Sequence, residues 1–326
     1  MKAVLLTGFE GTNSLQVADV PLPAFAADEV LIKVKAAGIN YAEVEQIHGR
    51  YLTFGKELPF VMGFEVSGMV SDVGSDVKSV NIGDRVTTFA LSGGFAEYAT
   101  AKAHALIPIP GQLDYGEAIT IPLQGMTAYT MLKYQVLPCK PGSILIQAAA
   151  GGVGIYLVQL AKAMGIKTVI ALAGSDEKLQ LATSLGADAA IDYTQPGWAD
   201  KVKDATYDKG VDVVLQMLTG KVGEESFKLI APGGRIVLFG AQNYHDTITT
   251  EQVRQLIWQN QTLAGFAFPA LDPQKIQESI PELLELIAKT PLRLFAQHAY
   301  SLDQAAEAFE LLQSRKTTGK VFFRLD

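Results

Sequence analysis

Apolar and polar positions follow two different patterns along the chain, and the change between them falls near residue 123. In the first part, short alternating runs are separated by glycine-containing turns, which is typical of strands in a β-rich domain. Such strands are expected at residues 1–10, 29–34, 65–73, 85–88 and 96–101. A similar alternation at residues 320–324 predicts a last strand that returns to this domain.

Beyond residue 122, continuous apolar runs alternate with helical patterns. The expected strands cover residues 143–147, 168–172, 189–191, 211–215 and 235–239, with helices between them. Apolar strands linked by helices indicate a parallel, doubly wound sheet. We therefore expect an α/β protein with two domains, one at residues 1–122 completed by residues 295–326, the other at residues 123–294.

An apolar strand, a glycine-rich turn and an apolar helix follow one another at residues 143–164. The turn fits the dinucleotide-binding fingerprint, with Ala149, Gly151 and Gly154 in its three glycine positions. Small residues let a pyrophosphate approach the backbone, and the helix start offers N–H groups and partial positive charge. The next strand follows at the spacing of a βαβ unit, which favours a dinucleotide site over an ordinary tight turn. The residues expected to hold the pyrophosphate are Ala150, Gly151, Gly152 and Val153.

The end of the second apolar strand carries no acid where NAD-specific sites place one. The hydroxyl of Ser175 and the ammonium of Lys178 suit the 2′-phosphate of NADPH, whereas a carboxylate there would repel it. We therefore expect NADPH (NADP) as the cofactor. In the alternative interpretation, Ser175 and Asp176 only cap the next helix and Lys178 is a solvated side chain.

The composition limits the function classes. The chain has 326 residues, of which 48% are hydrophobic and 19% charged, and a formal net charge of -7, so it is globular and ill suited to nucleic acid or an anionic membrane surface. No apolar run reaches the roughly 18 residues of a membrane span, and we expect a cytoplasmic protein. The one cysteine, Cys139, excludes an internal disulfide and is expected in a loop or as a buried structural residue.

Six motifs appear in the order found in the medium-chain dehydrogenases/reductases. They are Ala37-Gly-Ile-Asn40, Gly63-Phe-Glu-Val-Ser-Gly68, Gly83-Asp-Arg-Val86, Gln124-Gly-Met-Thr-Ala-Tyr129, the glycine-rich turn, and Leu185-Gly-Ala-Asp188. Over essentially its whole length, the chain resembles the zinc-free quinone oxidoreductase branch, which includes the ζ-crystallins. The resemblance implies a GroES-like β-rich catalytic domain, a Rossmann domain and a nicotinamide cofactor.

The resemblance also bears on zinc. Alcohol dehydrogenases of the superfamily place a cysteine where Asn40 stands and a histidine where Phe64 stands. The four histidines, His48, His104, His245 and His298, show no ligand spacing, so we expect exposed or structural roles for them and no bound metal. Without a Lewis acid, reduction of quinones or conjugated enones is a more natural reaction than oxidation of a simple alcohol.

Three residues are implied by the resemblance to act on the nicotinamide and the substrate. Asn40 orients both through its planar amide, unless it is only a turn asparagine. Thr127 lies at a helix start facing the cofactor, unless it only caps that helix. Tyr51 lines the substrate cleft and donates to a developing oxyanion, unless it is a surface aromatic. Relatives can have a second tyrosine where this chain has Glu45, whose carboxylate we expect to face water.

Other residues are implied to contact the cofactor. Tyr193 and Arg315 match positions near the adenosine 2′-phosphate or the pyrophosphate, and Gly174 stands where relatives often have a serine donor. Four residues fall where the family lines the nicotinamide pocket, although aromatics at sheet edges also serve as plain core. They are Phe239, Gly240, Phe266 and Phe268.

The sequence thus predicts an NADPH-dependent reductase of quinones or α,β-unsaturated carbonyl compounds, acting by direct hydride transfer on a small-molecule substrate. Two alternatives stay open. An enoyl-thioester reductase requires a longer channel with basic residues for a phosphopantetheine arm, and a dinucleotide-binding protein with a structural or sensor role has little turnover. The apolar stretch at residues 261–268 predicts an edge strand, and pairing of two such edges predicts a homodimer.

Overall fold

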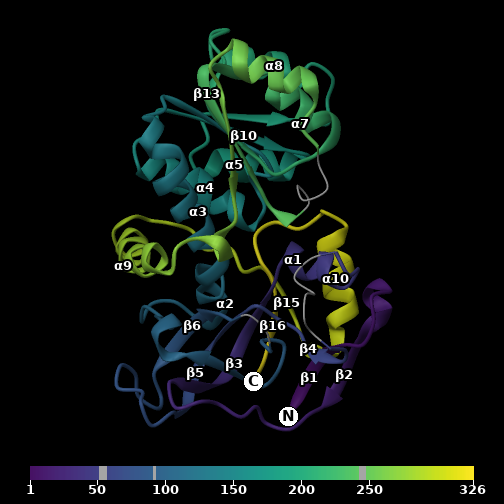
Figure 1. Ribbon diagram of the computed structural model, residues 1–326, viewed down its shortest axis with the longest axis vertical. Coiled ribbons are helices and arrows are strands. Elements are labelled where there is room, and N and C mark those ends of the chain that lie inside the picture. The colour runs from purple at the N-terminus through teal and green to yellow at the C-terminus, as the bar shows by residue number, and fades with distance from the viewer. Residues whose placement is uncertain (51–56, 91–92, 242–246) are drawn as a thin grey trace. The chain divides into compact units, whose positions relative to one another are not determined.

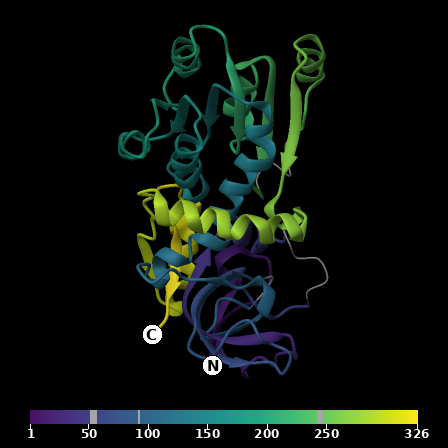
Figure 2. The same cartoon turned by 90° about the vertical axis from the view of Figure 1, so that its left-hand side faces the viewer.

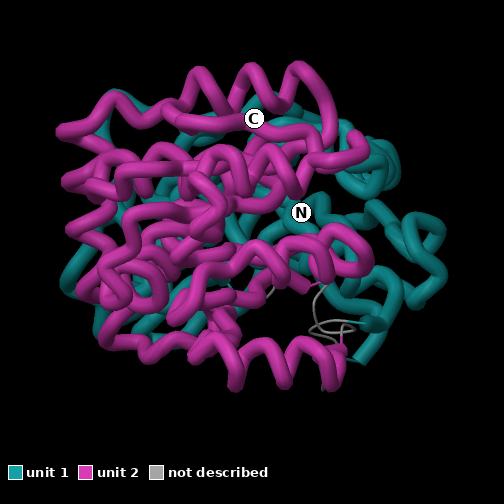
Figure 3. The backbone as a smooth tube through the Cα atoms, turned by 90° about the horizontal axis from the view of Figure 1, so that it is seen from above, with its two compact units in different colours: residues 1–123, 294–326 teal, residues 124–293 magenta. Residues whose placement is uncertain are grey.

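The computed structural model describes residues 1–50, 57–90, 93–241 and 247–326. The chain divides into two compact units, shown in Figure 3. Unit 1 comprises Met1–Leu123 and Leu294–Asp326, and unit 2 comprises Gln124–Arg293. Each unit has its own core.

Unit 1 is β-rich and is built on a three-stranded and a seven-stranded sheet. The small sheet has the order β2-β1-β4, and the large one β15-β16-β3-β5-β6-β8, with β7 paired to β3. The strands are β1 (Lys2–Leu6), β2 (Leu15–Asp19), β3 (Glu29–Ile39), β4 (Phe60–Val61), β5 (Glu65–Val73), β6 (Arg85–Phe89), β7 (Tyr98–Lys102), β8 (Ile107–Pro108), β15 (His298–Tyr300) and β16 (Val321–Arg324). The last strand, β16, pairs antiparallel with β3, as its alternating pattern predicts.

The core of unit 1 joins both sheets to the C-terminal helix. The helices are α1 (Tyr41–Gln46), α2 (Tyr115–Ala118) and α10 (Ala305–Gln313). Phe95 packs edge-on against Phe309 of α10 and Phe323 of β16, with ring centroids 6.3 and 4.9 Å apart. Such aromatic pairs add to the stabilisation from burial alone, so the C-terminal segment is an integral part of this core.

Unit 2 contains a doubly wound sheet, of which β10 and β13 are labelled in Figure 1. Its six strands follow the order β11-β10-β9-β12-β13-β14. All of its pairings are parallel. The strands are β9 (Ser143–Ile146), β10 (Thr168–Ala173), β11 (Ala189–Asp192), β12 (Val211–Gln216), β13 (Ile230–Phe239) and β14 (Thr262–Phe266). The strand order reverses at β9, and open sheets of this kind bind ligands at the carboxyl end of that reversal. The expected parallel sheet is confirmed.

The central strand of unit 2 is covered on both faces. Ile144, Leu145 and Ile146 of β9 are all fully buried although successive side chains point to opposite faces. This burial explains why the strands of unit 2 read as continuous apolar runs. The helices are α3 (Met126–Met131), α4 (Gly152–Ala163), α5 (Asp176–Ser184), α6 (Trp198–Ala205), α7 (Gly220–Phe227), α8 (Thr250–Trp258) and α9 (Pro273–Lys289).

Two further observations concern the surface. Among the helices of the described residues, none combines the length and the apolar character that a membrane crossing requires. Cys139 ends a short 3-10 turn and is exposed, so the loop alternative applies and the buried one does not.

Strand β14 lies at the edge of the unit 2 sheet, and within the described residues β13 is its one strand neighbour. Helix α8 ends just before β14 in the chain, as the green helix and strand in Figure 2 show. It exposes two large apolar side chains, Ile257 at 74% and Trp258 at 84%. An open edge beside exposed apolar groups favours pairing with another edge.

We expect a homodimer that pairs the β14 edges of two copies. Light scattering at micromolar concentration is expected to give about 70 kDa, twice the 35.0 kDa of the chain. Thr262→Lys places a charge on the exposed edge and is expected to shift the mass toward the monomer. Ile82→Lys, at an exposed apolar position of unit 1, is the control and is expected to leave the mass unchanged. A wild-type mass of one chain would contradict the expectation.

Candidate active site

The glycine-rich turn joins β9 to α4 through a close backbone approach. A Cβ atom on Gly154 would lie 2.7 Å from the Cα of Ala149, a distance that real Cβ atoms do not reach. Glycine is therefore required where the helix packs against the turn, which is the role of the third glycine in the fingerprint.

The residues at the start of α4 are accessible. Gly151 is the N-cap, and Gly151, Gly152 and Val153 are partly exposed, whereas Ala150 is buried. The first N–H groups of a helix have no intrahelical acceptor. A partly exposed helix start with small residues therefore has the shape and the donors that a pyrophosphate requires.

The neighbouring strand β10 ends in a short polar segment. Gly174 and Ser175 are exposed, and Ser175 is the N-cap of α5, yet its side chain makes no capping hydrogen bond to the described residues. Lys178 in the first turn of α5 is half-buried, and this burial lowers the pKa of its ammonium against a smaller opposing effect of Glu177. Ser175 therefore occupies the N-cap position without a capping bond from its hydroxyl, and Lys178 is only partly solvated.

Tyr193 lies beside this segment. It follows β11, which pairs in parallel with β10, and its N–H donates to the carbonyl oxygen of Ala173 over 3.2 Å. A Cβ atom on Gly174 would lie 3.1 Å from the Tyr193 hydroxyl oxygen. The structure thus brings Gly174, Ser175 and Tyr193 together at the carboxyl ends of two strands. The tyrosine hydroxyl occupies the space that a serine side chain at position 174 would approach.

The aromatic candidates lie at the carboxyl ends of β13 and β14. Phe239 and Phe266 are paired in register, and Gly240 follows Phe239 with a φ of +88°. Phe239 and Phe268 are buried, which agrees with a core role as well as with a pocket wall.

Thr127 is the second residue of α3, so it lies in the first turn of that helix. A π-helical segment, Ile121–Gly125, runs directly into α3, and the preceding Gly125 has helical φ and ψ of −62° and −50°. Because the backbone is already helical before Thr127, this residue is not the N-cap of α3. The threonine is half-buried beside the kind of π-helical irregularity that is frequent at functional sites.

In unit 1, Asn40 joins a buried charge pair. Its Nδ2 donates to Glu65 Oε1 over 2.9 Å, and its Oδ1 accepts from Lys320 Nζ over 2.6 Å. Lys320 and Glu65 also form an ion pair with each other, and both are fully buried. No local sequence pattern predicts this network. Its signs in the sequence are a lysine at the start of the apolar terminal strand and a glutamate at the start of another apolar strand.

A second buried carboxylate, Glu43, holds the backbone around this network. It accepts from the Asn40 N–H over 3.0 Å and from the Phe64 N–H over 3.2 Å. Burial raises the pKa of the Glu43 carboxyl to about 8, with an opposing effect of Lys320 and a reinforcing one of Glu65. Phe64 itself is buried, so an apolar ring fills the position where zinc-dependent relatives have a histidine.

Glu45 does not face water, which corrects the prediction for this residue. It is 6% exposed and accepts from Arg50 Nε over 2.6 Å. Helix α1 turns this side chain inward, and the arginine five residues later supplies the counter-charge that a buried carboxylate needs.

Arg315 is an exposed residue of unit 1 after α10, with a φ of +56°. Tyr51 and His245 lie outside the described residues. Within the described residues, no group of three or more His, Cys, Asp or Glu side chains has a geometry that holds a metal ion.

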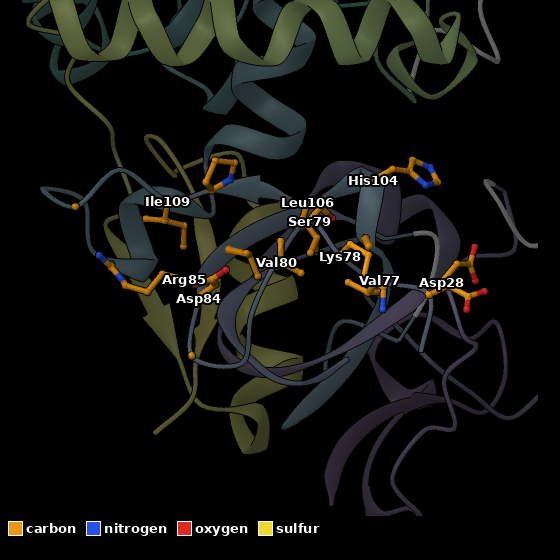
Figure 4. Close-up of a pocket in the computed structure, with 16 residues that line it drawn as sticks. Asp28, Val77, Lys78, Ser79, Val80, Asp84, Arg85, His104, Leu106 and Ile109 are labelled. Atoms are coloured by element: carbon orange, nitrogen blue, oxygen red, sulfur yellow. The ribbon is translucent and has the colours of Figure 1, made fainter. Parts of the chain in front are cut away.

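Unit 1 also has a surface hollow of about 950 Å³ on the side of β6 and β8 (Figure 4). Its lining includes Val80, Arg85, His104 and Ile109. Among the described residues, none of the predicted site residues lines it, and we assign it no part in the site.

The pKa of Glu43 predicts a pH dependence of stability. Between the ordinary carboxyl value and pH 8, the folded state keeps a proton that the unfolded state has released, so the free energy of unfolding falls as the pH rises. The slope is at most about 1.4 kcal/mol per pH unit. Glu43→Gln removes this titration, so the stability of the wild type relative to this variant is expected to fall between pH 5 and pH 8.

Urea denaturation at several pH values measures this difference. Glu310→Gln, at an exposed position of α10, is the control for removal of one negative charge from unit 1. A constant difference between the wild type and Glu43→Gln across this pH range would show that Glu43 keeps an ordinary pKa.

Comparison with known proteins agrees with this architecture. The model of the alcohol dehydrogenase GroES-like domain matches residues 26–111, and that of the zinc-binding dehydrogenase matches residues 152–289. The quinone oxidoreductase of Rattus norvegicus is 31% identical over 100% of this chain and 98% of its own length.

Solved structures give the same result. The structure of Escherichia coli quinone oxidoreductase complexed with NADPH is 28% identical, covers 100% of both chains and has a TM-score of 0.90. The CurK enoyl reductase structure is 27% identical, covers 100% of this chain and 99% of its own, and has a TM-score of 0.88. The expected superfamily, branch and fold are confirmed: the chain belongs to the quinone oxidoreductase branch of the medium-chain dehydrogenases/reductases.

Proposed function

We propose that this protein is an NADPH-dependent oxidoreductase that reduces quinones or α,β-unsaturated carbonyl compounds by direct hydride transfer without zinc. The observation that carries the proposal is the carboxyl edge of the unit 2 sheet. There an accessible glycine-rich helix start lies next to a strand that ends without an acid. Ser175 follows that strand, and Lys178 lies in the first turn of α5 together with Asp176 and Glu177. The proposal includes a homodimer in the cytoplasm.

The residues at this edge fit the cofactor. The N–H groups at the start of α4 would hold the pyrophosphate, and Ser175, Lys178 and the Tyr193 hydroxyl would donate to the 2′-phosphate. Asp192, the last residue of β11, directly precedes Tyr193. Its carboxylate accepts from the Thr194 N–H and hydroxyl over 2.8 and 2.7 Å, so it is hydrogen-bonded within its own turn. The NADPH bound to the E. coli relative supports this choice of cofactor.

The substrate side of the proposal rests on donors instead of a metal. When bound, the nicotinamide supplies the hydride. The protein then has to orient the acceptor and stabilise the oxygen that gains negative charge, which fixed hydrogen-bond donors do well in a dry site. Asn40 and Tyr51 are proposed for this role, and Thr127 for contact with the cofactor. Phe64 cannot ligate zinc, and neither a cysteine nor a histidine stands at position 40.

A second candidate function is reduction of an enoyl thioester, because the CurK enoyl reductase structure is similar over the whole chain. The two reactions share the chemistry of hydride addition to a conjugated carbonyl. They differ in whether the protein binds a long thioester arm. A cofactor-binding protein with little turnover is the third possibility, and measurable turnover in an assay would exclude it.

A substrate screen tests the proposed function. Purified protein with NADPH is expected to reduce naphthoquinones, phenanthrenequinone or alkenals faster than a crotonyl thioester, with less than one zinc per chain and with no loss of activity in a chelator. Faster reduction of the thioester would favour the second candidate. Stoichiometric zinc, or inactivation by the chelator that added zinc reverses, would contradict the metal-free part.

Cofactor preference tests the role of Lys178. We expect NADPH to bind more tightly than NADH, and Lys178→Ala to weaken NADPH binding by about 10–100-fold, or roughly 1.5–3 kcal/mol, because a charge-assisted hydrogen bond is lost. Fluorescence titration measures both. The matched control is Lys167→Ala, which removes an exposed lysine directly before the amino end of β10. Equal affinities of the wild type for the two nucleotides would end this assignment.

The proposed donors predict different kinetic losses. Tyr51→Phe is expected to lower kcat by up to about 10²-fold for enones and less for quinones, with little change in NADPH affinity, because an enolate needs more stabilisation. Asn40→Ala is expected to weaken both cofactor positioning and turnover, since it misplaces the reacting atoms. Single-turnover hydride transfer with one quinone and one enone measures both effects. Wild-type rates for Tyr51→Phe on both substrates would reduce the tyrosine to a wall of the cleft.

A further inference from the structure

The side-chain amide of Asn40 is held at both of its ends. Its carbonyl oxygen accepts from Lys320 Nζ over 2.6 Å, and its nitrogen donates to Glu65 Oε1 over 2.9 Å. An ammonium has only donors and a carboxylate only acceptors. The reverse orientation of the amide would place N–H groups against Lys320 and the carbonyl against Glu65, so the pair selects one orientation.

The three residues differ in exposure. Lys320 and Glu65 are fully buried, whereas Asn40 is partly exposed. An amide nitrogen carries two N–H groups and the carbonyl oxygen two lone pairs. After its bond to Glu65, the Asn40 amide nitrogen keeps one N–H. Asn40 is the member of the network that a ligand can reach.

The backbone is shaped to admit the charge pair. A Cβ atom on Gly38 would lie 2.5 Å from Lys320 Cε and 2.8 Å from Glu65 Cδ, so β3 tolerates the pair only because position 38 is glycine. Phe322 of β16 pairs in register with this glycine. The charges therefore come together where β3, β5 and β16 adjoin, directly before Asn40 in the chain.

Stability alone is a weak reason for such a pair. Two buried charges lose hydration, and apolar side chains of similar size in their place are often neutral or stabilising. Glu65 also has one oxygen, Oε2, that is buried and has no hydrogen-bond partner among the described residues. The arrangement gains in return a single orientation of the Asn40 amide.

We propose that Lys320 and Glu65 are positioning residues that fix the Asn40 amide in one orientation, so that its remaining N–H is presented to the acceptor oxygen or the nicotinamide. The proposal rests on the proposed function for what the amide contacts. The orientation itself rests on the two hydrogen bonds alone.

The state of the amide is observable without catalysis. The chain has five asparagines, so selective ¹⁵N-asparagine labelling yields few side-chain signals, and the Asn40 signal is assigned by its loss in Asn40→Asp. We expect its amide hydrogens to exchange at least about ten-fold more slowly than those of exposed Asn81 in the same wild-type spectrum. Equal exchange rates would overturn the proposal without recourse to any variant.

Two double variants separate orientation from charge. Glu65→Met with Lys320→Met removes both charges together, which leaves no unpaired buried ion. It is expected to abolish the protection of Asn40 and to slow single-turnover hydride transfer by about 10–100-fold, with NADPH affinity changed by less than about three-fold. Glu65→Lys with Lys320→Glu keeps an ion pair but favours the reversed amide. It is expected to keep the thermal stability of the wild type without restoring the rate.

The control is Asp28→Asn with Lys102→Met, which removes an exposed ion pair of 2.9 Å from the same unit and is expected to change neither readout. Full recovery of the rate in the charge-swapped variant would show that the pair has a structural role only. Wild-type protection and rate in the double methionine variant would equally overturn the proposal. If the wild type transfers no hydride to any acceptor, the proposed function fails, and the exchange measurement still decides the positioning.

Discussion

The close packing of α4 against the end of β9 determines what the unit 2 sheet can bind. Gly154 is required because a side chain there would collide with Ala149, and this contact sets the helix start beside the carboxyl ends of the strands. In a parallel sheet these ends share one edge. The N–H groups of the first turn of α4 lie at that edge because this backbone contact allows the helix to begin there. The Ser175 and Lys178 side chains and the aromatic residues of β13 and β14 lie at the same edge because the parallel strands end together.

Much of this fold is predictable from the sequence, because burial determines the pattern. Strand β5 has the expected bounds, Glu65–Val73, and the five expected apolar strands of unit 2 all form. Two strands, β3 and β13, are each five residues longer than predicted. β3 extends to Ile39 through Ala36, Ala37 and Gly38, whose small side chains hide the alternation. β13 begins at Ile230 although Pro232, Gly233 and Gly234 indicate a turn. Both extensions depend on neighbouring strands, which local patterns do not contain.

The site is less predictable, because its polar groups meet across long stretches of chain. Lys320 lies 280 positions after Asn40 and 255 after Glu65, so the network exists only once β16 has returned to β3. Glu45 is buried because Arg50 neutralises it, and an acidic residue in a helical pattern gives no sign of that pairing. The π-helical segment directly before Thr127 has no counterpart in the local sequence pattern. In contrast, the glycine-rich turn requires only local sequence, and its prediction is confirmed in conformation.

Direct hydride transfer is the central claim, and isotope tracing tests it most directly. NADPH deuterated at one or the other C4 position of the nicotinamide is reacted with an enone, and the saturated product is analysed by mass spectrometry. The account predicts one deuterium at the β-carbon of the product from one of the two labelled cofactors, and none from the other. A product that carries only solvent hydrogen with both cofactors, or no product with any enone or quinone, would contradict it.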